Sequence, residues 1–406
     1  MQRLVRYALL LAIVFGSVSV SAQSDPTSNV LVRVYAAQAK SSTMEVLAPG
    51  DTTPKDKKDY FSGLSVTYSA DGKWIGGYGL HEGSTSPQVY YAQAGQTLVQ
   101  VTLPAQATPM RIAFSPDAHY FSYTVLAFTT QQWTMGIIDL TNGKQAQFTG
   151  KSSPGPVIGD ATPDLTAVQG MALPMTWSLD GKRLYLESFI FSMAAPRHFD
   201  GLYGLDFSTI DFSKSDPQAL PQTTVLLRDD KIFGEPLFSP DNTKILYLSN
   251  DPANAPENYA PTKFSQTANT LSVLDLDTGK SSVIAQAPKG QAMAASQWTP
   301  DSKSILYAVG GFQKTSYVVG SKGELFDLAS GKSQEIGTFE SDPQSYLVSV
   351  IVCGNNVFFV SKVYKDDFSG DASLYFAPIS DLKSRSAALV IAQNVTLLRC
   401  AMNAPL

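Results

Sequence analysis

The residues best suited to acid–base or metal chemistry in this sequence are three histidines and the carboxylates near them. His81 is followed directly by Glu82, and His198 precedes Asp200. Imidazole beside carboxylate is a pairing that metal sites and general acid–base catalysts use. The two pairs are far apart in the chain and lack the close ligand spacing of a known metal motif. We therefore expect solvated histidines here, with no metal site and no cofactor.

Sequence motifs of common enzyme classes are absent from the chain. There is no Gly-x-Ser-x-Gly nucleophile turn, no His-Glu-x-x-His zinc motif and no glycine-rich phosphate loop. The acidic segment 365–371 lacks the alternating order of a calcium loop, and we expect an ordinary turn there. A non-catalytic protein is favoured. The alternative is an enzyme, such as a lyase, hydrolase or cyclotransferase, that uses loop carboxylates and calcium.

Aromatic side chains supply a second kind of chemistry, because large rings contribute much of the binding energy at many interfaces. Several aromatics fall in long segments between strand-like runs, with carboxylates beside them. Each ring could instead anchor its own loop. As a set they predict a surface that binds a protein or a peptide, with a glycan as the other option. The residues expected to form it are Phe199, Tyr259, Phe264, Phe312, Tyr317, Tyr364 and Phe368.

Composition narrows the class of partner. The chain has 406 residues, of which 44% are hydrophobic, and its 30 basic and 35 acidic residues give a net charge of −5. A protein that binds the nucleic-acid backbone needs an excess of basic residues, so we exclude nucleic acid as a partner. Two cysteines are too few for a disulfide-rich scaffold or a multi-cysteine metal cluster.

Residues 1–22 have the pattern of a secretory signal. Arg3 and Arg6 precede an apolar run that extends from Tyr7 to about Val20, and small residues suit cleavage after Ala22. The run is shorter than the ~20 residues that span a bilayer, and no later apolar run approaches that length. The sequence thus predicts a periplasmic or secreted bacterial protein with no membrane span after signal cleavage.

A short turn sequence recurs along the rest of the chain. It consists of an aromatic residue, Ser or Thr, a small or apolar residue, and Asp, and it lies between apolar runs. Such a sequence suits a tight hairpin, because Asp accepts hydrogen bonds from the turn backbone and Pro presets φ. The five copies are Tyr68-Ser-Ala-Asp71, Phe114-Ser-Pro-Asp117, Trp177-Ser-Leu-Asp180, Phe238-Ser-Pro-Asp241 and Trp298-Thr-Pro-Asp301.

A second, glycine-containing turn follows three of these copies, at 138–144, 274–280 and 326–332. Two hairpins per repeat make a four-stranded antiparallel unit, which is the blade of a β-propeller. The aromatic-Ser-Pro-Asp turn resembles that of the TolB-type propellers of bacterial envelopes, over about residues 29–403. This resemblance implies an all-β propeller but says little of activity, because such propellers include interaction scaffolds as well as domains of some peptidases.

Degenerate copies near both ends bear on the blade number. Residues 352–356 and 399–403 resemble each other, and 31–42 aligns without gaps on 271–282. We expect N-terminal outer strands and a C-terminal inner strand to share the blade that closes the ring, with six or seven blades, seven favoured, in one domain over 23–406. Export, an even cysteine count and equivalent positions predict a disulfide between Cys353 and Cys400, although equivalent positions on adjacent blades can lie too far apart.

Loop length differs between the two faces that such blades present. One face is expected to carry only the short Asp and Gly turns. The other is expected to carry the long connections, and long loops on one end of a rigid scaffold usually bind. We therefore predict an exported, non-catalytic binding or scaffolding propeller that uses its loop-rich face. The long segments are 79–87, 127–132, 150–170, 188–201, 249–269, 309–321 and 361–372.

Overall fold

The computed structural model is almost entirely β-structure. Among the residues it describes, the helical segments are two 3-10 turns, η2 (Phe207–Thr209) and η4 (Leu382–Ser384). No helix in this part of the chain has the length and apolar character needed to cross a bilayer. The described residues are 30–36, 41–47, 56–61, 65–69, 71–79, 86–151, 170–190, 198–214, 216–227, 232–251, 268–312, 318–340, 345–363, 372–384, 386–391 and 395–400. The signal sequence expected at 1–22 lies outside them.

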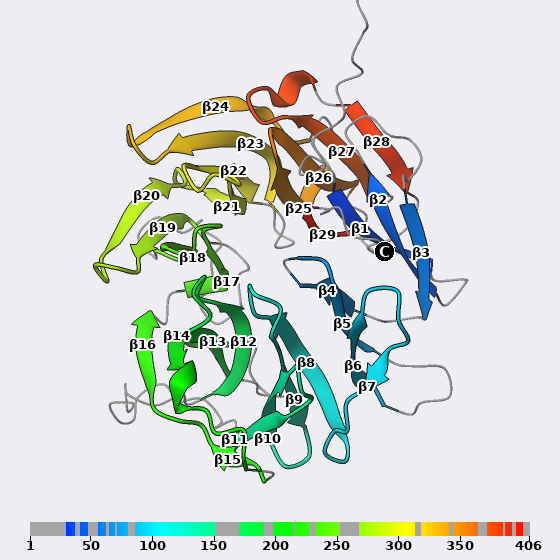
Figure 1. The fold of residues 1–406 in the computed structure, drawn as a ribbon. Coiled ribbons are helices and arrows are strands. Elements are labelled where there is room, and N and C mark those ends of the chain that lie inside the picture. The colour runs from blue at the N-terminus through cyan, green and yellow to red at the C-terminus, as the bar shows by residue number, and fades with distance from the viewer. Residues whose placement is uncertain are drawn as a thin grey trace, which may run out of the picture.

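The strands form runs of four antiparallel neighbours that follow one another around a centre (Figure 1). The innermost strands are β4 (Ser65–Tyr68), β8 (Ala107–Phe114), β12 (Met171–Trp177), β17 (Ile232–Phe238), β21 (Gln291–Trp298), β25 (Ser345–Cys353) and β29 (Val395–Cys400). The second strands are β5 (Trp74–Gly79), β9 (Tyr120–Ala127), β13 (Arg183–Ile190), β18 (Lys244–Ser249), β22 (Ser304–Phe312), β26 (Asn356–Val363) and β1 (Val30–Ala36).

The two outer layers complete each run. The third strands are β6 (Gln88–Gln93), β10 (Gln132–Asp139), β14 (His198–Asp206), β19 (Thr270–Asp275), β23 (Val318–Asp327), β27 (Ala372–Pro378) and β2 (Ser41–Leu47). The fourth strands are β7 (Val99–Gln100), β11 (Gln145–Lys151), β16 (Thr223–Leu227), β20 (Ser281–Gln286), β24 (Lys332–Thr338), β28 (Ser386–Ile391) and β3 (Asp56–Phe61). Each run is a four-stranded antiparallel unit of the kind expected for a propeller blade.

The first and last described strands lie in the same sheet. β29 pairs with β1 in antiparallel register, with Val30 opposite Cys400, and the sheet continues through β2 to β3. β29 also contacts β25 and β26 of the preceding run. N-terminal outer strands and a C-terminal inner strand therefore share one unit, as the sequence predicts.

A disulfide joins Cys353 to Cys400 at the ends of the inner strands β25 and β29. Their Cα atoms are 5.3 Å apart, within the range that a disulfide needs, so equivalent positions on adjacent units do not prevent the bond here. The bond links residues 47 apart in sequence and fastens β29 to the preceding run.

The five Asp turns share one hydrogen-bond pattern. In the turn of Asp117, Ser115 Oγ donates to Asp117 Oδ1 at 2.6 Å, and the backbone N–H of Tyr120 donates to Ser115 Oγ at 2.9 Å. The N–H of His119 donates to the same carboxylate oxygen at 3.1 Å. The turns of Asp71, Asp180, Asp241 and Asp301 repeat these three bonds. The hydroxyl and carboxylate thus satisfy backbone donors that a tight turn leaves free.

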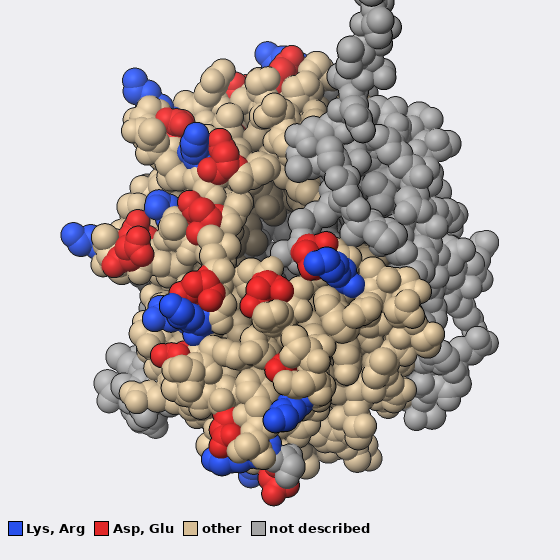
Figure 2. All heavy atoms as spheres, viewed as in Figure 1, with Lys and Arg blue, Asp and Glu red and all other residues tan. Residues whose placement is uncertain are grey.

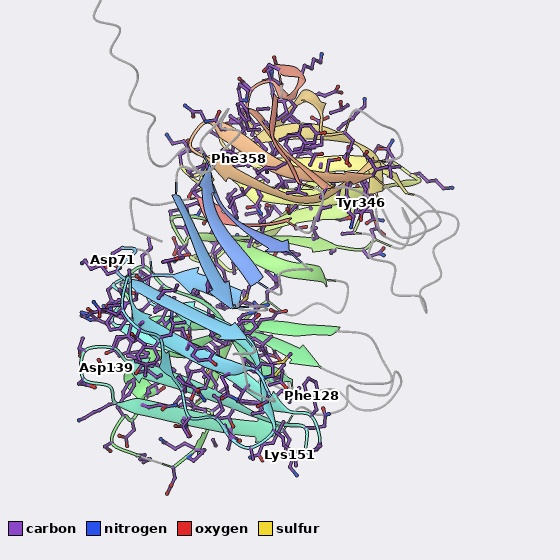
Figure 3. All side chains as sticks on the ribbon, turned by 90° about the vertical axis from the view of Figure 1, so that its right-hand side faces the viewer. Asp71, Phe128, Asp139, Lys151, Tyr346 and Phe358 are labelled. Atoms are coloured by element: carbon purple, nitrogen blue, oxygen red, sulfur yellow. A yellow bond between two sulfur atoms is a disulfide. The ribbon has the colours of Figure 1, made fainter. Side chains whose placement is uncertain are left out.

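Adjacent Asp turns contact one another. Asn242 Nδ2 donates to the Trp177 carbonyl at 2.7 Å, and the N–H of Asp241 donates to Ser302 Oγ at 3.0 Å. A side view places Asp71 and the glycine-turn residue Asp139 on the same side of the molecule (Figure 3). We call this side, where the Asp and Gly turns lie, the turn face.

The sequence predicted only short turns on the turn face, but the structure also places two longer connections there. β14 ends at Asp206, opposite Arg183, and so delivers the connection 207–222 to the turn face. This connection contains η2 and a short strand, β15 (Gln218–Ala219), which pairs in parallel with β11 of the neighbouring run. A second excursion, 379–385, contains η4. The expectation was wrong because the repeat of turn sequences does not reveal where the outer strands begin.

Apolar side chains fill the spaces between successive runs. The largest described cluster lies between β8–β11 and β12–β16, where the buried Trp177 stacks on Tyr120 with ring centroids 5.6 Å apart. Phe207, from the 207–222 connection, packs against both rings. An ion pair of two largely buried side chains, Arg111 on β8 and Glu187 on β13, spans the same two runs with Nη1 and Oε2 3.0 Å apart. Loss of one partner would leave a buried charge unpaired and would destabilise the fold. The ion pair therefore holds the two runs in one relative position.

Most inner strands contain a β-bulge. The register with the second strand skips one residue at Met110, Met175, Ala294 and Val348, on β8, β12, β21 and β25 respectively. A bulge bends its strand and re-aims the extra side chain. At Val348 the side chain stays 47% exposed, beside the centre of the molecule.

Candidate binding face

The side opposite the turn face carries the connections between second and third strands. Phe128, Lys151 and Tyr346 lie on this side, away from Asp71 and Asp139 (Figure 3). We call it the loop face. The strand ends that meet it flank the connections 80–87, 128–131, 191–197, 250–269, 313–317 and 364–371, together with 152–170 between runs. Strand direction therefore brings the long segments singled out in the sequence to one face.

Two of the seven aromatics expected to bind lie in strands. Phe199 belongs to β14, where it pairs with Phe189, and Phe312 belongs to β22, where it pairs with Val318. Placing them in loops was wrong, because these hairpins continue their cross-strand pairing further toward the loop face than the sequence indicates. The remaining five, Tyr259, Phe264, Tyr317, Tyr364 and Phe368, lie outside the described residues.

The turn between β9 and β10 is the best-described part of the loop face. Phe128 is 37% exposed there, and Gln131, with a φ of 56°, donates from Nε2 to the Phe128 carbonyl at 2.9 Å. The nearby Trp133 is buried and packs flat on Gly150, where an added Cβ would lie 2.5 Å from its ring. The two aromatics at the two ends of this hairpin thus differ, because Phe128 is partly exposed and Trp133 belongs to the core.

A side-chain clamp closes the base of the connection 250–269. Asn269 is buried, and its amide bonds the backbone of Asp251 in both directions: Asp251 N–H donates to Oδ1 at 2.7 Å, and Nδ2 donates to the Asp251 carbonyl at 2.8 Å. Thr270 Oγ1 donates to the same Oδ1 at 3.1 Å. The clamp satisfies polar groups that would otherwise be buried unpaired, and it fixes both ends of a long segment.

A buried carboxylate lies where the runs β21–β24 and β25–β28 meet. Glu340 accepts hydrogen bonds from Ser321, from its N–H at 2.6 Å and from its hydroxyl at 3.0 Å. Burial raises the pKa of Glu340, and the bonds from Ser321 oppose that rise. Close by, Val319 pairs with Tyr346 and joins the two runs into one eight-stranded sheet. This cluster holds two units together at the loop face.

The histidines do not come together in the described structure. His119 lies on the turn face, exposed, with its Nδ1 3.3 Å from Asp117 Oδ2. His198 lies in β14, and His81 is outside the described residues. Within the described part of the chain, no group of three or more His, Cys, Asp or Glu side chains is close enough to hold a metal ion. The segment 365–371 is also outside it.

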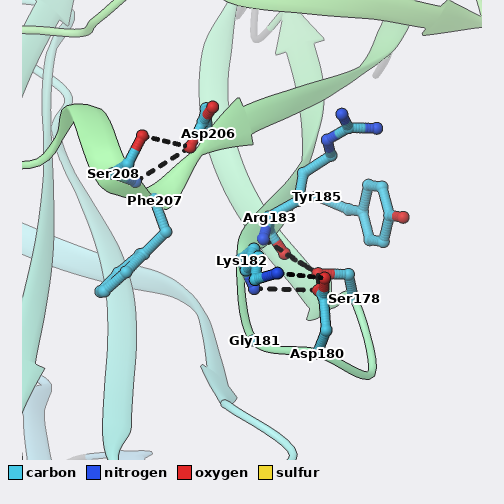
Figure 4. Close-up of a pocket in the computed structure, with 9 residues that line it drawn as sticks. All are labelled: Ser178, Asp180, Gly181, Lys182, Arg183, Tyr185, Asp206, Phe207 and Ser208. Carbon is cyan, nitrogen blue, oxygen red and sulfur yellow. Dashed lines mark hydrogen bonds and ion pairs between the residues drawn. The ribbon is translucent and has the colours of Figure 1, made fainter.

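A concavity of about 710 Å³ lies on the turn face, where the sequence predicted no site. It is formed by the Asp180 turn and by the residues at which β14 leads into the 207–222 connection (Figure 4). Around it, charged side chains of both signs alternate over the turn face, which surrounds a central hollow (Figure 2). The available signal was the run of polar and aromatic residues after Asp206, which no other repeat contains.

Comparisons with known proteins identify the fold by structure but not by sequence. No family model matches the chain, and no curated protein matches it. Among solved structures, an oligogalacturonate lyase from Vibrio parahaemolyticus is similar at 13% identity and a TM-score of 0.52, covering 89% of this chain and 85% of that one. The β-propeller domain of the Trilobed protease from Pyrococcus furiosus is similar at 10% identity and a TM-score of 0.51, covering 89% of this chain and 94% of that one.

Two further likenesses are weaker or partial. A prolyl endopeptidase is similar at 12% identity and a TM-score of 0.52 over 80% of this chain, which spans only 42% of that protein. TolB from Acinetobacter baumannii is similar at 13% identity with a TM-score of 0.42, covering 77% of this chain and 64% of that one. At these identities the likenesses show the fold alone: the protein is a β-propeller.

Proposed function

We propose that this protein is an exported, non-catalytic binding or scaffolding propeller whose loop face binds a protein or peptide partner. The observation that carries the proposal is the division of connections between the two faces. Most turns of the turn face are short and use their polar groups internally, whereas the longest connections leave the loop face from strands that are held rigidly. Binding residues commonly lie on such loops, because the scaffold can vary them without losing its core.

Exposed apolar side chains support the loop face as a contact surface. Phe128 is 37% exposed on that face. The aromatics expected from the sequence, including Tyr259, Phe264 and Tyr364, fall in connections that start and end on the same face. Rings in this setting are the usual anchors of a protein interface. Export rests on the pattern of residues 1–22, and a glycan is the other partner class that aromatics beside carboxylates would suit.

Photo-crosslinking tests which face meets the partner. A benzophenone amino acid at Phe128 on the loop face is compared with the same group at Leu179, which is 60% exposed on the turn face. In envelope extract, we expect a discrete adduct from position 128 and none from position 179. An adduct from 179 alone would contradict the assigned face.

Alanine substitutions then measure how the binding energy is distributed. With the captured partner, Tyr259→Ala, Phe264→Ala, Tyr317→Ala and Tyr364→Ala should each weaken binding by about 1–3 kcal/mol with little change in Tm. Asp117→Ala on the turn face should lower Tm and leave affinity unchanged. Turnover of a substrate that is abolished by replacing Glu82 or Asp200 would instead establish the enzyme alternative.

A further inference from the structure

The concavity on the turn face contains Arg183, whose positive charge acts on the facing Asp206 without a direct ion pair between the two side chains. Lys182 Nζ lies 3.7 Å from Asp180 Oδ2, so these two charges form their own pair. Among the described residues, no carboxylate lies within ion-pair distance of the Arg183 guanidinium. The Arg183 side chain lies across Gly204, where an added Cβ would be 2.7 Å from its Cδ. Gly204 therefore leaves room for the stem of Arg183 along the strand.

An anion with spare capacity lies opposite. Asp206 is the register partner of Arg183, and its Oδ1 accepts from the N–H and the hydroxyl of Ser208, at 2.9 and 2.8 Å. These bonds, and to a smaller extent the positive charge of Arg183, hold the pKa of Asp206 below its ordinary value, so the group is ionised at neutral pH. Within the described structure, no donor meets Asp206 Oδ2. The turn thus orients the carboxylate and leaves one of its oxygens available.

Two aromatic rings form rigid walls of the concavity. The Tyr185 ring stacks on that of Phe238 in the next run, with ring centroids 4.6 Å apart. The ring centroid of Phe207 lies 4.8 Å from that of Trp177. Arg183 and Tyr185 lie on one side, and Asp206, Phe207 and Ser208 on the other (Figure 4). Because packing already fixes both rings, a ligand would meet a largely preformed site.

We propose that this concavity is a second binding site and that it takes a zwitterionic ligand of dipeptide size. The ligand's carboxylate lies against Arg183, and its ammonium group lies against Asp206 Oδ2. A ligand with one charge would satisfy only one of the two groups and would meet repulsion from the other, whereas a zwitterion compensates both. The volume of about 710 Å³ is within the range of small-ligand sites and exceeds the need of a single amino acid.

Four forms of one dipeptide separate the two charge contributions. Alanyl-phenylalanine is titrated into the full-length protein by calorimetry, alongside its N-acetyl form, its C-terminal amide and the form blocked at both ends. We expect saturable binding of the free dipeptide, weakening by at least about tenfold when either end is blocked, and none when both are blocked. Equal binding of all four forms, or no binding up to about 10 mM, would overturn the proposal.

Substitutions with matched controls place the ligand. Arg183→Met and Asp206→Asn should each weaken binding at least about tenfold, and Arg183→Lys should restore part of it. The controls are Lys303→Met, an exposed cation of another Asp turn, and Asp211→Asn, whose carboxylate bonds Ser213 as Asp206 bonds Ser208. Both controls should bind as the wild type does. Because Asp211→Asn makes the same change of charge in an equivalent turn, a loss in Asp206→Asn alone reports the ligand and not the fold, whereas equal loss in both would refute the site.

Discussion

The two faces of this propeller are built by different means. On the turn face, five turns repeat the same three hydrogen bonds, and adjacent turns bond one another through Asn242 and Ser302. On the loop face, the described contacts are individual: a Gln131 turn, an Asn269 clamp and a Glu340–Ser321 cluster, each found once. Repeated local chemistry stabilises one end of the propeller, whereas the contacts described at the other end are not repeated. The following experiments test that division.

Removing the disulfide should have the largest effect, because it fastens two inner strands at their turn-face ends. A bond that closes a loop of 47 residues restricts the unfolded chain by about 4 kcal/mol on the chain-entropy account. Replacing Cys353 and Cys400 together by Ser should lower the free energy of unfolding by roughly that amount, measured by urea denaturation without reductant. An unchanged midpoint would mean that the ring is held at this position by strand pairing alone.

A smaller loss is expected from one turn hydroxyl. Ser115 is fully buried and accepts the N–H of Tyr120, so Ser115→Ala leaves that donor without its acceptor and should cost about 1–2 kcal/mol. The loop-face counterpart is Thr130→Ala, an exposed turn hydroxyl whose bonds are 3.4 Å or longer, which should change stability by less than about 0.5 kcal/mol. Thermal melts of both variants compare the faces directly, and equal losses would contradict the division.

The smallest effects should have opposite pH dependence on the two faces. The Thr299 hydroxyl and the Lys303 N–H hold the pKa of Asp301 below its ordinary 3.8, so its contribution to stability is present above pH 3.8 and is lost as the pH falls through the folded pKa. Burial raises the pKa of Glu340 above 4.5, so its contribution is present below pH 4.5 and is lost as the pH rises through the folded pKa.

Single substitutions isolate these two trends. As the pH rises from 3 to 7, Asp301→Asn should become less stable relative to the wild type, and Glu340→Gln should become more stable relative to it. Urea midpoints across that range measure both differences. Slopes of the same sign for the two variants would show that the carboxylates of the two faces do not differ as described.

Features with a local and repeated cause were predictable from the sequence. The Asp turns, the all-β propeller fold and the sheet shared by β1 and β29 all follow from short motifs that occur more than once. The burial of Trp133 was not predictable, since it depends on Gly150 of the next strand. Nor was the concavity at Arg183, which requires the 207–222 connection to fall on the turn face, a matter of strand direction that no local motif encodes.

The pairing of β1 with β29 also sets an order of assembly. A ribosome releases β1 long before β29, so the edge of β1 has no native partner until residues 395–400 emerge. Contacts of such high sequence separation form slowly, and an unpaired edge is open to association with other chains. The terminal sheet should therefore be the last to form, and molecules interrupted before β29 should aggregate first. A circular permutant opened at the Gly95 turn would move this late step to the sheet of β4–β7.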